Sequence, residues 1–322
     1  MGVVIRQFIV VGTKKDRVTI WDKHFGVSPI YSIFSKDGKL IEQRENPYSN
    51  GKDHDNPELI VGFLQDAEVF LAKNMGAKSK EKLLDLGISS FLTDKNSIFD
   101  AVNFYIEALK KFDIFDKFYE RYEEWFDRNE FVYNSEINML KKAIPKNGLG
   151  IEIGVGSGRF ADPLKIPYGV EPSMEMAKIA KSKGIKVYQG FAEKLPIMGA
   201  KFDFALIAVT ICFVNDPIKT IKETYRILKK GGKIIVAIVD KNTKIGSEYL
   251  KKQQNSDFYK VAKFFSSEDI IKMIESSGFK FSYAYQTLFG NNIKSINEVQ
   301  KSKRGYGEGG FAAIVGDAVI KI

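Results

Sequence analysis

The chain is poor in the two residue types that most often bind transition metals. Its 322 residues contain one cysteine, Cys212, and two histidines, His24 and His54. A single cysteine excludes an internal disulfide and any zinc site built from cysteines alone. The scarcity of cysteine also fits a reducing compartment, so we expect a cytoplasmic protein.

Long apolar runs are missing as well. No segment reaches the roughly 20 apolar residues that a membrane-spanning helix needs. The first residues lack the apolar region and cleavage site of a signal peptide. Arg6 stands where a myristoylation signal has Ser or Thr. We therefore expect no membrane partner.

Charge is abundant, but the excess of positive charge is uneven. The net charge of +9 arises beyond residue 116, where 33 Lys and Arg residues face 23 Asp and Glu residues. This excess could attract an acidic partner, or it could simply cover exposed helix surfaces. Basic residues form no block beyond Lys301, Lys303 and Arg304, so we do not expect a nucleic acid as the partner. The oligomeric state is left open.

At this length two domains are expected, and the first is predicted to span residues 1–113. Residues 3–11, 17–20, 31–35 and 39–43 have the β-branched character of strands, the last two joined by a Lys-Asp-Gly turn. From residue 57 to 111 helical and strand patterns alternate. Such an order predicts an α/β domain with a mixed sheet.

The motifs of this first segment resemble a known family. His24-Phe25-Gly26 is followed by Pro29-Ile30-Tyr31, and Asn74-Met75-Gly76 precedes a helix that ends at Leu86-Gly87-Ile88. Over residues 3–111 this resembles the NifX/NifB-type dinitrogenase iron–molybdenum cofactor biosynthesis domain. The resemblance implies a ribonuclease-H-like fold and suggests that this domain could bind a metal or metal cluster.

The two histidines are the candidate metal ligands of this domain. Both lie in predicted loops, and His54 stands between Asp53 and Asp55. Imidazole is a common metal ligand. The alternative for His24 and for His54 is a hydrogen-bonded structural role.

Residues 114–145 are predicted to form a helical linker or lid. Aromatic residues at positions 115, 118, 119, 122, 125 and 126 recur at spacings of three and four, so one helical face is aromatic. A second helix is expected at 135–143. The aromatic face could pack in a core or between domains, or it could cover a cofactor cleft with Tyr119 and Tyr122 in it.

The most informative stretch is residues 148–160, Gly-Leu-Gly-Ile-Glu-Ile-Gly-Val-Gly-Ser-Gly-Arg-Phe. An apolar strand ends there in three glycines at alternate positions, Gly154, Gly156 and Gly158, which permit positive φ and close backbone approach. Arg159 stands where a dinucleotide fingerprint needs its third glycine, and the Gly-Lys-Ser/Thr of a Walker loop is absent. G-x-G-x-G two residues after an acid, Glu152, is the pattern of S-adenosylmethionine (SAM) enzymes. A glycine turn without a ligand is the alternative.

A second acid supports this interpretation. Glu171 ends the next predicted strand, seventeen residues beyond Gly154. An acid at the end of the second strand of a doubly wound unit can accept hydrogen bonds from both ribose hydroxyls. Ser173 is expected to cap the helix that follows and that Gly184 ends.

Five segments then follow one another in a recognisable order: Glu-x-Gly-x-Gly-x-Gly, Val-Glu-Pro-Ser, Gly-x-Ala-Glu-x-Leu-Pro, Phe-Asp-x-Ala and Arg-x-Leu-Lys-x-Gly-Gly, all within residues 150–239. This order resembles the class I SAM-dependent methyltransferases, specifically the UbiE/methyltransferase-11-like group. The resemblance implies a doubly wound, seven-stranded Rossmann-like domain over residues 114–322. It also implies SAM as methyl donor and S-adenosylhomocysteine as product.

The resemblance assigns a role to each matching residue. The three glycines would approach the methionine part of SAM, with Glu152 beside its amino group and Glu171 on the ribose. The residues expected around the adenine are Pro172, Ser173, Met174, Ala192 and Glu193, with Leu195 as an apolar wall. Phe191 stands where the family often has Asp. Thr210 and Ile211 would face the methyl-transfer cleft.

No catalytic residue is fixed by these patterns, because methyl transfer from a sulfonium mainly needs alignment, plus a base if the nucleophile is protonated. The candidates are Tyr119, Tyr122, Tyr306 and Glu308. The last two lie in the glycine-rich segment 305–310, for which a turn without a catalytic role is the alternative. Cys212, near the expected cleft, is interpreted as a buried inert thiol.

The sequence therefore predicts a SAM-dependent methyltransferase that acts on a small-molecule acceptor. The alternative is a carrier or sensor of a metal cofactor whose second domain only binds SAM. A third hypothesis, an enzyme that modifies RNA or protein, draws on the positive charge of the second segment. The fourth strand does not end in Asn/Asp-Pro-Pro-Tyr/Phe, which argues against amino-methylation of DNA bases.

Overall fold

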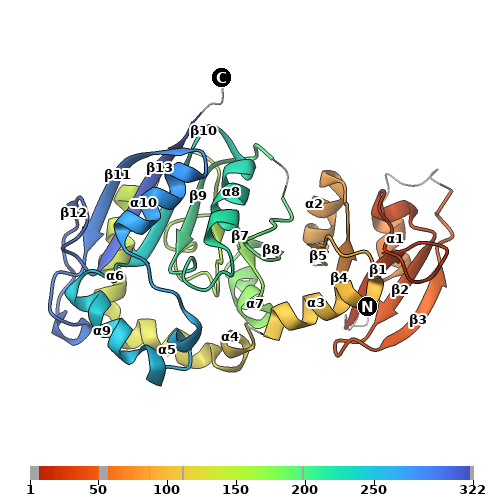
Figure 1. The fold of residues 1–322 in the computed structure, drawn as a ribbon, viewed down its shortest axis with the longest axis horizontal. Helices are drawn as coiled ribbons and strands as arrows, with labels where there is room; N and C mark the ends of the chain where they lie inside the picture. Colours follow the sequence, from red (N-terminus) through yellow and green to blue (C-terminus); the bar gives the residue numbers. More distant parts are fainter. Residues whose placement is uncertain (1–6, 51–56, 87, 111, 198, 320–322) are drawn as a thin grey trace. The chain divides into compact units, whose positions relative to one another are not determined.

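The structure is a computed structural model that describes residues 7–50, 57–86, 88–110, 112–197 and 199–319. The chain divides into two compact units (Figure 1). Unit 1 is Met1–Asp113 with Tyr188–Gly190, and unit 2 is Ile114–Val187 with Phe191–Ile322. Among the described residues, no helix combines the length and the apolar content needed to span a bilayer.

Unit 1 is built on a five-stranded sheet in the order β3-β2-β1-β4-β5. Its strands are β1 (Phe8–Thr13), β2 (Ile30–Phe34), β3 (Leu40–Glu45), β4 (Ala67–Ala72) and β5 (Ser89–Leu92). Its helices are η1 (Phe25–Val27), α1 (Pro57–Phe63), α2 (Ala77–Asp85) and α3 (Ile98–Lys110). Strand β1 pairs antiparallel with β2 and parallel with β4. The mixed α/β sheet predicted from the sequence is confirmed.

The strand expected at residues 17–20 does not form. The segment makes only isolated bridges through Thr19 and Ile20. The Asp16 carboxylate accepts backbone hydrogen bonds from Val18 and Thr19 at 3.0 and 2.9 Å, and Arg17 has a φ of 64°. An aspartate side chain that pins its own backbone in this way competes with strand pairing, whereas β-branched composition alone indicated a strand.

Three consecutive helices open unit 2: α4 (Asp113–Lys117), whose first residue is the last of unit 1, α5 (Tyr119–Arg128) and α6 (Glu130–Ala143). They confirm the helical character expected from the aromatic spacing. The chain breaks twice, at Phe118 and at Asn129. The last helix therefore starts at Glu130, five residues earlier than the sequence predicts.

An eight-stranded sheet follows, in the order β12-β11-β13-β10-β9-β6-β7-β8. Its strands are β6 (Gly150–Ile153), β7 (Tyr168–Glu171), β8 (Lys186–Gln189), β9 (Phe202–Ala208), β10 (Leu228–Val239), β11 (Phe279–Thr287), β12 (Lys303–Arg304) and β13 (Phe311–Ala318). The other helices are α7 (Met174–Ser182), α8 (Pro217–Ile227), α9 (Lys244–Lys252), α10 (Ser267–Ser276), η2 (Gln253–Asn255), η3 (Tyr259–Val261) and η4 (Ile293–Ser295). Strands β7, β6, β9 and β10 pair in parallel, and β13 runs antiparallel between β10 and β11. The seven expected strands are present, and β12 adds a two-residue edge.

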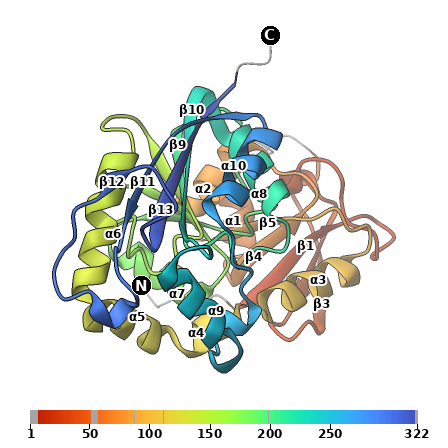
Figure 2. The same ribbon diagram turned by 60° about the vertical axis from the view of Figure 1, so that its left-hand side comes forward.

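Helices cover both faces of this sheet, so its central strands are apolar on both sides. Alternate residues of β9, β10 and β13 pack with α6 in one core cluster: Phe204, Leu206, Ala208, Ile235, Ala237, Phe311, Ala313 and Val315. Helices α8 and α10 lie on the side of the sheet opposite α6 (Figure 2). On that side Gly316 leaves room for Ile274 of α10, whose Cδ1 would lie 3.0 Å from an added Cβ.

The parallel strands bring four chain segments to one edge. β6, β7, β9 and β10 all end there, and ligands of doubly wound sheets bind at this carboxyl edge. Helices α5 and α9 lie across the same end of the sheet, where β10 leads into α9 (Figure 1).

A buried aspartate stabilises this edge. Asp240 follows β10 and is 2% exposed. Its Oδ2 accepts hydrogen bonds from the backbone N–H and the hydroxyl of Ser267, at 3.0 and 2.6 Å, and its Oδ1 accepts one from the N–H of Asn242 at 2.9 Å. One carboxylate therefore joins the end of β10 to the start of α10.

We expect Asp240→Ala to lower the free energy of unfolding by about 2–4 kcal/mol, because it leaves buried donors without an acceptor. Urea denaturation followed by far-ultraviolet circular dichroism measures the loss. Asp162→Ala, at an exposed position, is the control and should stay within about 0.5 kcal/mol of the parent. Equal stability of the two variants would contradict the role given to Asp240.

Candidate functional site

The three glycines of the loop after β6 have positive φ but different surroundings. Their φ angles are 72° at Gly154, 54° at Gly156 and 84° at Gly158. A Cβ at Gly154 would lie 2.2 Å from Cγ2 of Thr210, and one at Gly158 would lie 2.6 Å from Cδ1 of Ile185. At Gly156, among the described residues other than its two chain neighbours, the one atom within 4 Å of an added Cβ is the Tyr122 hydroxyl oxygen, at 3.9 Å. Two glycines thus permit close packing of the protein, and Gly156 borders open space.

Glu152, on β6, carries a buried carboxyl with an unused oxygen. The residue is 1% exposed, and its Oε2 has no hydrogen-bond partner among the described residues. Burial raises the pKa of this carboxyl well above its ordinary value, the Glu171 charge raises it further, and a hydrogen bond from the backbone of Ala161 opposes the rise. A buried acceptor left unpaired costs about 1–3 kcal/mol. The position therefore favours a ligand that donates a hydrogen bond.

Glu171, at the end of β7, joins the glycine loop to α7. Its Oε2 accepts a hydrogen bond from the N–H of Gly156 at 2.8 Å, and its Oε1 accepts one from the N–H of Ser173 at 2.9 Å. Burial raises the pKa of Glu171 to about 7, although both hydrogen bonds act to lower it. Each carboxylate oxygen keeps a second lone pair for another donor.

Ser173 caps α7, as the sequence predicts. Its Oγ accepts a hydrogen bond from the N–H of Met176 at 3.2 Å and donates one to Asp116 of α4. The same oxygen of Asp116 accepts a hydrogen bond from the N–H of Glu175 at 3.2 Å. Pro172 is buried and Met174 half-buried, so this segment borders Glu171 with a well-anchored turn.

The segment expected to flank adenine is largely buried. Phe191 and Ala192 are each 8% exposed, and Leu195 is 1% exposed. The Oε1 of Glu193 accepts hydrogen bonds from the N–H groups of Asn215 and Asp216, at 2.7 and 3.4 Å. Glu193 therefore holds the loop before α8, a role that its motif did not indicate.

The residues after β9 contact the glycine loop through Thr210. The Thr210 hydroxyl donates to the carbonyl oxygens of Gly154 and Ala208, at 3.1 and 3.0 Å. Ile211 has no exposed surface, so it packs in the protein interior. Burial raises the pKa of the Cys212 thiol to about 12, and the thiol donates to the Val209 carbonyl at 3.2 Å. Cys212 is half-buried, and its interpretation as a buried inert thiol stays a prediction.

Helix α5 is attached to the glycine loop by a charged contact. The Glu123 carboxylate accepts hydrogen bonds from the Ser157 hydroxyl and from Nε of Arg159 at 2.8 Å. Nη2 of Arg159 donates to the Glu123 carbonyl at 3.1 Å, and Nη1 lies 3.0 Å from Asp127. Arg159, which argued against a dinucleotide fingerprint, thus anchors a helix of the predicted lid.

Tyr122 brings an aromatic ring to the two buried acids. Its ring centroid lies 5.1 Å from that of Phe126 and 6.1 Å from that of Phe115. Burial raises the pKa of its phenol far above the ordinary value, and the charges of Glu152 and Glu171 raise it further. Of the two candidate tyrosines on α5, this one lies near the acids. Tyr119 donates instead to its neighbour Glu120, at 3.2 Å.

Tyr306 and Glu308 lie at the far edge of the sheet. The Tyr306 ring lies 6.3 Å from that of Phe281 on β11, and Glu308 faces Lys303 of β12 at 3.5 Å. Strand β12 is five positions from β6 in the sheet order, a separation of about 24 Å at the usual strand spacing. The described contacts do not bring either residue to the glycine loop.

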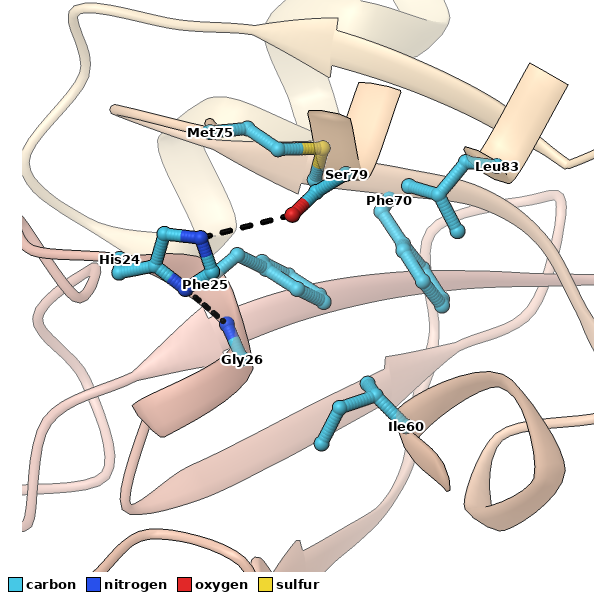
Figure 3. Close-up of a pocket in the computed structure, with 8 residues that line it drawn as sticks. All are labelled: His24, Phe25, Gly26, Ile60, Phe70, Met75, Ser79 and Leu83. Atoms are coloured by element: carbon cyan, nitrogen blue, oxygen red, sulfur yellow. Dashed lines mark hydrogen bonds between the residues drawn. The ribbon is translucent and has the colours of Figure 1, made fainter. Parts of the chain in front are cut away.

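His24 lines a pocket of unit 1 (Figure 3). Nδ1 of His24 accepts a hydrogen bond from the N–H of Gly26 at 3.3 Å, and Nε2 lies 3.4 Å from the Ser79 hydroxyl. The other side chains that line the pocket are apolar: Phe25, Ile60, Phe70, Met75 and Leu83. Within the described ranges, no three His, Cys, Asp or Glu residues group to hold a metal ion. His54 lies outside these ranges, and the described donors do not fit a metal centre.

Two acids of unit 2 were missed by the sequence analysis. Asp116 looked like one acid among many on the linker helices. Glu136 is 5% exposed on α6, and burial raises its pKa to about 8. The available signal was an acid on the apolar face of a helix, among the buried residues Val132, Ile137, Met139 and Leu140.

Family comparisons agree with the two units. Residues 151–236 match the family model described as a methyltransferase domain, and residues 7–108 match that of the dinitrogenase iron-molybdenum cofactor. The chain is 29% identical over 202 residues to an uncharacterized protein of Mycobacterium tuberculosis, covering 60% of this chain and 70% of that protein.

Two relatives are much closer in sequence. An uncharacterized protein of Methanocaldococcus jannaschii is 49% identical over 209 residues, which cover 64% of this chain and all of that protein. A crystal structure from Thermotoga maritima, described as a SAM-dependent methyltransferase and possible histamine N-methyltransferase, is 49% identical, with a TM-score of 0.62. It covers 64% of this chain and 98% of that one. The chain therefore belongs to the class I SAM-dependent methyltransferases and carries, in addition, an N-terminal domain of the dinitrogenase iron-molybdenum cofactor family.

Proposed function

We propose that unit 2 binds SAM at the glycine loop and the end of β7, and transfers its methyl group to a small-molecule acceptor. The observation that carries the site is the unpaired, buried Oε2 of Glu152. The methionine part of SAM has a cationic amino group, which would give this oxygen its missing donor. The open side of Gly156, which the Tyr122 hydroxyl borders, gives the ligand room.

The other contacts of the proposed complex involve neighbouring residues. Glu171 is held in place by two backbone N–H groups, and the remaining lone pairs of its oxygens suit the two ribose hydroxyls. Adenine would lie between the segment Pro172, Ser173 and Met174 on one side and Ala192 and Glu193 on the other. Phe191 offers this ring apolar contact only.

Methyl transfer needs little from the protein beyond alignment of the reacting groups and a site from which water is excluded. Bound SAM supplies a methyl group on a positively charged sulfur, and the carbon–sulfur bond breaks as the bond to the acceptor forms. Helix α5, attached through Glu123 and Arg159, would exclude water and hold Tyr122 beside the loop. Thr210, which contacts Gly154, would border the reacting groups. Alignment of this kind can supply much of the rate enhancement.

Aromatic side chains near the loop support a small, compact acceptor. The ring of Phe115 lies 5.3 Å from that of Phe213 and 5.5 Å from that of Phe258. Small-molecule sites are mostly lined by such apolar rings. The relative from Thermotoga maritima is described as a possible histamine N-methyltransferase, and a small amine is the acceptor class that this description suggests for the present chain.

A carrier role for unit 1 is not favoured. Both ring nitrogens of His24 have hydrogen-bonding neighbours, and the donor set in the described ranges does not form a metal site. We therefore assign no step to a metal. A cytoplasmic location stays a prediction from the low cysteine content.

Gly156→Ala should weaken binding of SAM and of S-adenosylhomocysteine at least tenfold, because the added methyl group would enter the space beside the loop. Isothermal titration calorimetry measures both affinities. Gly231→Ala is the matched control: Gly231 also has a positive φ, 71°, and open space around it, but it lies at the start of β10. In both variants the alanine Cβ at a positive φ causes similar backbone strain, of about 1–2 kcal/mol. Unchanged affinity in Gly156→Ala would contradict the proposed position of the ligand.

Binding of SAM should strengthen as the pH rises from 5.5 to 7. Ribose hydroxyls donate to a carboxylate, and Glu171, with a pKa of about 7, must lose its proton to accept them. Below this pKa the affinity should fall by up to about tenfold per pH unit from Glu171 alone.

Other acids contribute to the pH dependence of SAM binding. Asp116 raises the pKa of Glu171, and Glu152 has a raised pKa of its own. Glu171→Gln should therefore reduce the slope of log Kd against pH by about one proton and leave the part that belongs to Glu152. Equal slopes in the parent and in Glu171→Gln would show that the ribose contact is wrongly placed.

A further inference from the structure

The chain between α9 and α10 meets helix α5 at a contact that is both charged and aromatic. Nη2 of Arg121, on α5, donates a hydrogen bond to Oδ2 of Asp257 at 3.1 Å, across 136 positions of the sequence. The guanidinium carbon of Arg121 lies 4.9 Å from the ring centroid of Phe258 and 4.8 Å from that of Phe118. One side chain of α5 therefore holds both an acid and a ring of a distant segment.

Residues 253–263 form a loop whose two ends are joined. Nε2 of Gln253 donates to the carbonyl oxygen of Ala262 at 2.6 Å. The N–H of Lys263 donates to the carbonyl oxygen of Cys212, in the turn after β9, at 2.7 Å. The base of the loop is thus fixed beside the carboxyl edge of the sheet, and the middle of the loop reaches α5.

Phe258 connects this loop to the proposed methyl-donor site. Its ring centroid lies 6.3 Å from that of Tyr122 and 5.5 Å from that of Phe115, distances at which aromatic rings attract one another. The Tyr122 hydroxyl in turn lies 3.9 Å from the place that a Cβ of Gly156 would take. Contacts therefore run from Arg121 through Phe258 and Tyr122 to the open side of the glycine loop.

We propose that Arg121 is a positioning residue of the methyl-donor site: it holds Phe258 against Tyr122, keeps the loop 253–263 closed as a cover, and so slows the release of bound SAM. The proposal rests on the proposed function, since it concerns the same site. The side chains of Arg121 and Asp257 are each 48% exposed, and exposed ion pairs and cation–π contacts are individually weak. The contact can therefore break and re-form as ligands exchange, a step that limits turnover in many enzymes.

The contact should act on the rates of binding more than on the affinity. Arg121 and Asp257 are not among the residues proposed to touch SAM, so their contact favours the closed loop equally with and without the ligand. An effect that is equal in both states shifts no binding equilibrium. It does change how often the site is open, and therefore both the association and the dissociation rate. A residue that merely supports the fold of the site would instead lower the affinity when removed.

The test follows the release of tritiated SAM from the full-length protein after a chase with excess unlabelled SAM. Arg121→Ala should release SAM at least fivefold faster than the parent, while the Kd from isothermal titration calorimetry stays within threefold. Arg128→Ala is the matched control, because Arg128 is also an exposed arginine of α5 and pairs with Glu124 of its own helix. Its release rate should stay within twofold of that of the parent.

A second variant tests whether Arg121 acts through the ring of the loop. Phe258→Leu removes the ring, keeps an apolar side chain, and should also speed release at least fivefold. The double variant should release SAM within twofold of the faster single variant, because side chains that act in one contact are not additive.

Three results would overturn the positioning role alone: equal release rates in the parent and Arg121→Ala, single effects that multiply in the double variant, or a Kd of Arg121→Ala that weakens by the same factor as release accelerates. A parent that binds no SAM would overturn the proposed function itself.

Discussion

Two backbone hydrogen bonds to one buried carboxylate hold the candidate site together. Glu171 receives the N–H of Gly156 from the loop after β6 and the N–H of Ser173 from the start of α7. The two donors belong to different turns, so the loop cannot move without disturbing the helix cap. The positive φ of Gly156 is what aims its N–H at the acid. The shape of the ligand space depends on this arrangement.

Three acids of unit 2, Glu136, Glu152 and Glu171, are buried and have raised pKa values. Each therefore holds its proton more tightly than in water, and a positively charged ligand would draw the proton off. Burial thus makes the negative charge conditional on a cation nearby. SAM is such a ligand at two positions, its amino group and its sulfur. The interior of unit 2 is suited to cations although the chain has a net positive charge.

Features set by the local chain could be predicted from the sequence. The glycine loop, the acid at the end of β7 and the Ser173 cap each depend on a few neighbouring residues. Contacts between distant segments could not be predicted: Arg159 meets Glu123 36 residues away, and Ser173 meets Asp116 57 residues away. Each of these acids looked in the sequence like an ordinary exposed helix residue.

Two expectations from the sequence differ from the structure for the same physical reason. Composition indicates Tyr306 and Glu308 as candidates, but they directly follow β12, which pairs with β11 at the edge of the sheet. Residues 17–20 have the composition of a strand, but the Asp16 carboxylate accepts hydrogen bonds from the backbone of Val18 and Thr19 and so competes with strand pairing. In each case a tertiary or side-chain contact decided the outcome over propensity.

The attachment of α5 to the glycine loop has a spectroscopic consequence. The chain has two tryptophans; Trp21 lies in unit 1, and Trp125 lies on α5, two residues after Glu123, with its ring 5.1 Å from that of Phe126. Each unit thus contains one tryptophan. In a Trp21→Phe background the tryptophan emission, excited selectively at long wavelength, comes from this helix alone, which makes its position observable in solution without an added label.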